Sequence, residues 1–145
     1  IPDDPYILEL KAQVLFESDD VAGALVPFNR AVNIIPEEPL IRFEYARALI
    51  ESPASGDLEN AVEQLKFALS REPKFASGWR NLGIAYGRLG DKGRSSIALA
   101  EEAILKGDFA AVNYHAGRAA EIFPRGSREW LQAEDLLLAA KNTKK

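Results

Sequence analysis

The fold of this chain is decided by the stretch WRNLGIAY at residues 79–86. Its apolar residues recur at spacings of three and four, which is the pattern of an amphipathic helix. Gly83 has no side chain to keep a partner helix away, and Tyr86 is large enough to fill the gap beside it. We therefore expect this stretch to belong to a pair of closely packed helices.

The same pattern occurs twice more, nearer the N-terminus. There its small and large residues are Ala12 with Leu15 and Ala46 with Leu49, about 34 residues apart. The following helices repeat as well, at a slightly longer interval, and match Ala24, Phe28, Ala31 and Pro36 with Ala61, Leu65, Ala68 and Pro73. A short insertion in the turn at 53–57 accounts for the longer interval. A helix–turn–helix period near this length is typical of the tetratricopeptide repeat (TPR), and the chain resembles that family.

Apolar periodicity predicts about eight helices, at 5–18, 21–34, 39–52, 58–71, 75–89, 92–106, 108–122 and 127–141. The linkers are short, so consecutive helices are expected to be antiparallel neighbours. Side chains that could cap helix N-termini are found at Asp4, Asp57, Asp108 and Ser127. The resemblance implies an all-α, right-handed α-solenoid of TPR helix pairs, forming a single domain over residues 1–145.

The third repeat departs from the pattern. We place the first three repeats at about 5–38, 39–75 and 76–107, but Glu102 and Gly107 stand where Ala and Pro are expected. The missing proline appears half a period later, at Pro124. Helix 92–106 can therefore serve two pairs, followed by a half-shifted pair at 108–141 whose last helix caps the stack, and a tail at 142–145.

Composition excludes several classes of function. The chain has no Cys and one His, so it offers no disulfide, no thiolate zinc site and no Ser-His-Asp triad; we expect no metal, no cofactor and no catalysis by this chain. A net charge of −4 without a basic cluster argues against nucleic acid. No apolar run is long enough for a membrane span. Because the sequence starts at Ile1 rather than Met, we expect a piece of a longer protein.

The first helix of each TPR pair lines a concave groove, and this groove is the candidate site. On the non-core side of these helices the predicted partner-binding residues are Tyr6, Glu9, Gln13, Phe16, Phe43, Arg47, Ile50, Arg80, Ile84 and Arg88. Guanidinium groups bind carboxylates and backbone carbonyls, and the apolar members add contact area. We expect the ligand to be an extended peptide or a loop of a partner protein. Because Glu9 and Glu44 are acidic, we do not expect a clamp for a C-terminal carboxylate.

A narrower resemblance extends along most of the chain. It rests on DDPY at 3–6, PLIR at 39–42, WRNLGIAYG at 79–87 and PRGSREWL at 124–131. These stretches look like the C-terminal TPR tail of bacterial periplasmic zinc metallopeptidases of the BepA type. The resemblance implies a periplasmic location, an N-terminal metallopeptidase domain in the same chain, and outer-membrane assembly proteins as partners. The zinc-binding HExxH motif is absent here, so neither zinc nor protease activity carries over to this chain.

An alternative is a free-standing TPR scaffold that self-associates or organises a complex. The first helix carries Tyr6, Ile7 and Leu10, which need cover if no earlier helix packs on them.

Overall fold

A computed structural model describes residues 3–143, and these residues form eight α-helices and no strand. The helices are α1 (Pro5–Glu17), α2 (Val21–Ile34), α3 (Pro39–Glu51), α4 (Asp57–Arg71), α5 (Ala76–Arg88), α6 (Lys92–Lys106), α7 (Phe109–Ile122) and α8 (Arg128–Thr143). Their ends lie within one or two residues of the predicted ranges. The all-α class is therefore confirmed.

The chain divides into two compact units, Ile1–Pro73 with α1 to α4 and Lys74–Lys145 with α5 to α8. Each unit is described by itself below. That residues 1–145 form a single domain stays a prediction.

Side-chain caps begin several helices, as the sequence predicts, with one exception. Asp4 Oδ1 accepts a hydrogen bond from the Tyr6 backbone N–H at 2.9 Å, and Asp108 and Ser127 cap α7 and α8 in the same way. The prediction for Asp57 is wrong. Gly56, with φ of 88°, is the N-cap of α4, and the Asp57 carboxylate instead accepts a hydrogen bond from Ser52 Oγ at 2.5 Å. Glycine readily adopts the positive φ that closes the longer turn. The helix therefore starts at Asp57, one residue before the predicted start at 58.

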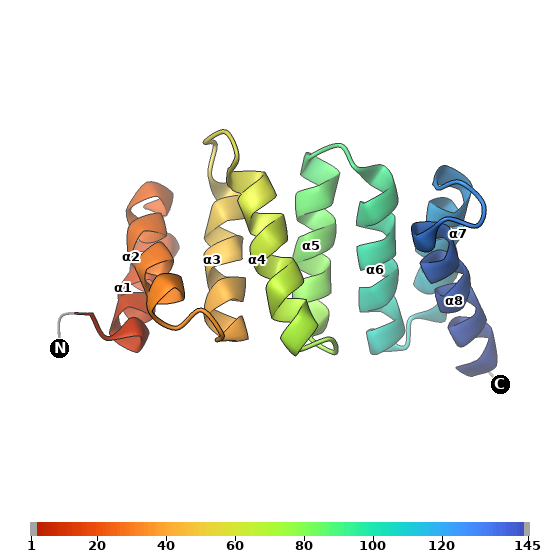
Figure 1. Cartoon of the computed structure of the whole chain (residues 1–145), viewed down its shortest axis with the longest axis horizontal. Helices are drawn as coiled ribbons and strands as arrows, with labels where there is room; N and C mark the ends of the chain where they lie inside the picture. Colours follow the sequence, from red (N-terminus) through yellow and green to blue (C-terminus); the bar gives the residue numbers. More distant parts are fainter. Residues whose placement is uncertain (1–2, 144–145) are drawn as a thin grey trace. The chain divides into compact units, whose positions relative to one another are not determined.

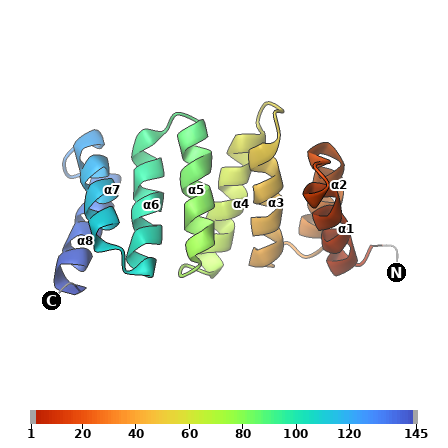
Figure 2. The same cartoon turned by 180° about the vertical axis from the view of Figure 1, so that it is seen from behind.

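The first unit consists of two layers. Figures 1 and 2 show α2 and α4 on one side and α1 and α3 on the other. Between the layers, Ala12 and Ala46 are fully covered, and the large side chains of Phe28, Leu49 and Leu65 are buried beside them. The alternation of small and large residues that the repeat predicts is therefore the core of this unit.

In the second unit, α5 and α6 pack closely at Gly83. Ser95 Oγ on α6 donates a hydrogen bond to the Gly83 carbonyl at 2.7 Å. A Cβ at Gly83 would lie 2.8 Å from Leu99 Cδ2, closer than such atoms pack. A larger residue here would therefore force the side chain of Leu99 to move.

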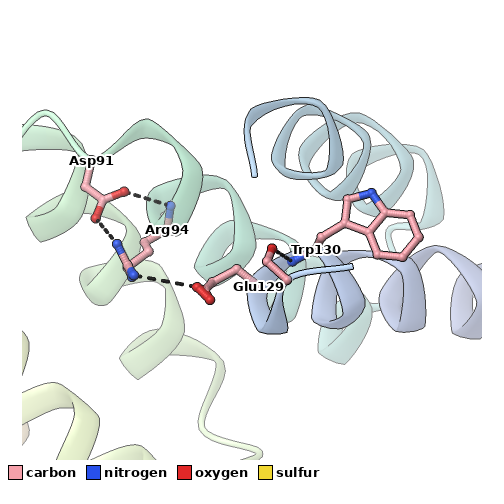
Figure 3. A network of polar contacts seen from close by, with 5 residues as sticks. Asp91, Arg94, Glu129 and Trp130 are labelled. Carbon is pink, nitrogen blue, oxygen red and sulfur yellow. Dashed lines mark hydrogen bonds and ion pairs between the residues drawn. The ribbon is translucent and has the colours of Figure 1, made fainter. Parts of the chain in front are cut away.

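Helix α6 is the central element of the second unit, because it contacts α5, α7 and α8. Its start is tied to α8 by Arg94, which pairs with Asp91 at 2.9 Å and with Glu129 at 3.7 Å (Figure 3). Ala100, Ala116 and Ala133, one from each of α6, α7 and α8, share one apolar cluster. Small residues again allow close packing.

Two glycine substitutions test this description of the second unit. We expect Gly83→Ala to lower the free energy of unfolding by about 1–3 kcal/mol, because Leu99 must move away from the new methyl group. Gly117→Ala in α7 is the matched control, since a Cβ there meets nothing within 4 Å. It should raise stability by about 0.5–1 kcal/mol by favouring the helix. Urea denaturation measures both, and equal effects of the two changes would contradict the close approach.

Candidate partner-binding surface

Four of the predicted groove residues lie together in the first unit. Glu9, Gln13 and Phe16 of α1 lie beside Glu44 and Arg47 of α3, and we call these five residues the α1–α3 surface. Gln13 Nε2 donates a hydrogen bond to Glu9 Oε1 at 2.6 Å. Arg47 pairs with Glu44 at 3.0 Å and holds its guanidinium 5.6 Å from the centre of the Phe16 ring. The surface therefore has an amide, an aromatic ring and three charges within one patch.

The α1–α3 surface has two carboxylates, Glu9 and Glu44, and one cation, Arg47, so one negative charge is left without a partner within this surface. Burial raises the pKa of Glu9 above its usual 4.5, and the negative charges of Glu44 and Glu38 raise it further. The hydrogen bond from Gln13 acts in the opposite direction. Arg47 is already paired with Glu44, so a cation supplied from outside would be attracted to Glu9 and Glu44.

Two predicted groove residues of the same unit are unsuited to binding. Phe43 is 6% exposed and Ile50 is 5% exposed, so neither offers much surface to a ligand. Helix α3 contacts α1, α2 and α4, and seven of its residues are buried. The prediction assumed a helix with one free face, and α3 is covered on more than one. Tyr6 remains exposed at the start of α1.

In the second unit, the predicted residues Arg80, Ile84 and Arg88 follow one another at one-turn intervals on α5. Arg80 is largely exposed and lies 3.9 Å from the carboxylate of Glu102 on α6. Glu102 is buried and is held more tightly by Lys106, at 2.8 Å. A buried carboxylate between two cations leaves this patch with net positive charge.

From the sequence, Glu44 is placed in the groove only as an argument against a carboxylate clamp, and Glu102 is not assigned to a binding patch. Glu44 stands three residues before Arg47, the spacing at which opposite charges pair on a helix. Glu102 stands where the repeat predicts alanine. The departure from the repeat was therefore visible in the sequence, and the structure shows that two basic side chains compensate for it.

His115, the one histidine, is half-buried on α7 beside Tyr114, with ring centres 5.0 Å apart. Burial lowers its pKa, and the charge of Arg118 lowers it further, against the opposing effects of Glu102 and Asp108. Within residues 3–143, no group of three or more His, Cys, Asp or Glu side chains is arranged to hold a metal ion. None of the helices in the described part is both long and apolar enough to cross a membrane.

Comparison with known proteins identifies the fold. A segment of 78 residues, 54% of the chain, is 36% identical to a TPR repeat-containing thioredoxin, TTL4, of Arabidopsis thaliana. The chain spans about a tenth of that relative, since the match covers 11% of its length. No protein-family model matches the chain.

Solved structures agree over a much larger part of the chain. The match to the crystal structure of MamA covers 99% of this chain and 80% of the MamA chain, with a TM-score of 0.68 and 16% sequence identity. TTC0263, a TPR protein of Thermus thermophilus, matches 94% of this chain with a TM-score of 0.54 at 21% identity, over 83% of its own length. The predicted tetratricopeptide-repeat fold is thus confirmed, whereas the narrower likeness to metallopeptidase tails stays a proposal.

The raised pKa of Glu9 makes a prediction about stability. The folded chain holds the Glu9 proton more tightly than the unfolded chain, so this group makes folding less favourable as pH rises above about 4.5. Glu9→Gln removes that charge and keeps an acceptor for Gln13. We expect the free energy of unfolding of this variant, measured by urea denaturation, to rise relative to that of the parent as the pH increases from 4 to 7. Glu63→Gln, at an exposed position on α4, is the control, and the same gain there would contradict the argument.

Proposed function

We propose that this chain is a protein-interaction module and that its α1–α3 surface binds an extended segment of a partner protein. TPR proteins stack helix pairs into extended surfaces of the kind that bind other proteins. The observation that carries the proposal is the repulsion between Glu9 and Glu44 in a partly buried setting. A Lys or Arg side chain of the partner would neutralise these carboxylates, and the face of Phe16 would contact the adjoining apolar residue.

Arg80, Ile84 and Arg88 form a second contact surface in this proposal. Its ligand would be of the opposite charge, because Arg80 lies beside a carboxylate that Lys106 already neutralises. An acidic side chain or a backbone carbonyl of the partner suits the guanidinium group of Arg80.

An array of unstructured 12-residue peptides with either Lys or Gln at the centre tests the α1–α3 surface. We expect the chain to prefer the Lys peptides, and the double variant Glu9→Gln/Glu44→Gln to bind them about tenfold more weakly. The control Glu59→Gln/Glu63→Gln removes the same charge from the exposed side of α4. If both double variants lose binding equally, net charge rather than this surface is responsible.

We further propose that the chain is the non-catalytic tail of a periplasmic zinc metallopeptidase involved in outer-membrane protein quality control. The support is the set of stretches at 3–6, 39–42, 79–87 and 124–131, which resemble such tails. In this proposal the chain recruits outer-membrane assembly proteins, and an upstream domain performs hydrolysis.

The coding sequence upstream of Ile1 tests the metallopeptidase proposal. We expect it to encode a signal peptide followed by a domain with an HExxH motif, because two histidines on one helix face are what a zinc peptidase needs. The intact protein should then be found in the periplasmic fraction. An upstream sequence without that motif rejects this proposal and leaves the peptide-binding proposal standing.

A further inference from the structure

We propose that α1 of one copy of this chain docks antiparallel on α8 of a second copy. The starting observation is a stripe of exposed apolar residues on α1. Helix α1 buries its own Leu8 and Ala12 in the first unit, yet its Ile7, Leu10 and Val14 are between 57% and 63% exposed. These three follow a spacing of three and four, which is the seam of a two-helix contact.

Helix α8 carries a stripe with the same spacing. It buries Ala133, Leu136 and Ala140 against its neighbours, while Leu131 and Leu138 are 51% and 56% exposed. Arg128 and Asp135 complete the stripe and are exposed as well. Each of the two helices thus has one face packed in its own unit and another face that follows a coiled-coil spacing.

The two stripes match in one antiparallel register. Ile7 lies opposite Leu138 and Val14 lies opposite Leu131, so both leucines on α8 meet an apolar partner. At one end of the same register, Glu17 faces Arg128. This one register therefore sets apolar residues against apolar residues and also brings opposite charges together.

The middle layer makes the contact specific. Here Leu10 meets Asp135, and Lys11 lies next to Leu10 where its ammonium group can reach the carboxylate of Asp135. A shift by two turns in one direction would set Glu17 against Asp135. The aligned parallel arrangement would set both Ile7 and Val14 against charged residues, Arg128 and Asp135, whereas the antiparallel register does so only at Leu10, since like positions of the heptad face one another in a parallel pair.

This contact joins different surfaces of the two copies, so it propagates head to tail unless the assembly closes into a ring. It buries few large side chains, and we expect weak, concentration-dependent association. The contact uses neither the α1–α3 surface nor Arg80, so it is independent of the proposed peptide binding.

Two variants, each blocked at one end, test the proposal by sedimentation velocity. The wild-type chain should increase in average mass between about 10 µM and 1 mM, a range typical of weak contacts. Val14→Lys, which would face Leu131, and Leu138→Lys, which would face Ile7, should each remain monomeric. Their mixture should form one-to-one dimers and nothing larger, because one intact α1 and one intact α8 are left. Leu40→Lys, at an exposed leucine of α3, should associate as the wild type does.

A charge exchange checks the register. Glu17→Arg or Arg128→Glu alone should weaken association about tenfold, and the double variant should recover it. The proposal is overturned if the wild type stays monomeric up to 1 mM, if the mixture of blocked variants stays monomeric, or if the double charge variant is no better than the single ones. Circular dichroism confirms that each variant is folded.

Discussion

Close packing between paired helices is the constraint on which the rest of the structure depends. Ala12, Ala46 and Gly83 stand at equivalent places in the repeats, and each is covered by a neighbouring helix. At Gly83 the approach is so close that one methyl group would collide with Leu99. Helices held at this distance expose only narrow faces, and these faces carry the residues available for binding.

The repeat and its small residues could be predicted from sequence because they obey local rules. Helix periodicity and capping by Asp4, Asp108 and Ser127 each involve residues within one turn of one another. The cap predicted at Asp57 is wrong for a local reason too: Gly56 adopts a positive φ at the end of the inserted turn and is itself the N-cap of α4. The capping rule fails here because the inserted turn makes Gly56, rather than Asp57, the last residue before the helix.

The candidate site was harder to predict, because exposure depends on what packs from outside the repeat. Phe43 and Ile50 occupy groove positions in the pattern, yet helix α3 is covered on several sides and both are buried. Arg80 is predicted as a groove residue from its helix position, and spacing gives no sign that Glu102 of the next helix lies beside it. Sequence spacing determines which side of a helix a residue occupies, but it does not determine whether that side is left open.

Helix α1 shows how one amphipathic segment can serve three purposes. Because successive residues are turned by about 100° around a helix, Leu8 and Ala12 share the core face, Glu9 and Gln13 lie on a second face, and the apolar stripe around Leu10 lies on a third. The second face meets Glu44 and Arg47 of α3, whereas the third is exposed. Polar residues on the second face suit a hydrated peptide, and apolar residues on the third suit another helix. A ligand on one face therefore need not displace a neighbour from the other, which allows a chain assembled end to end to keep every α1–α3 surface open for a partner.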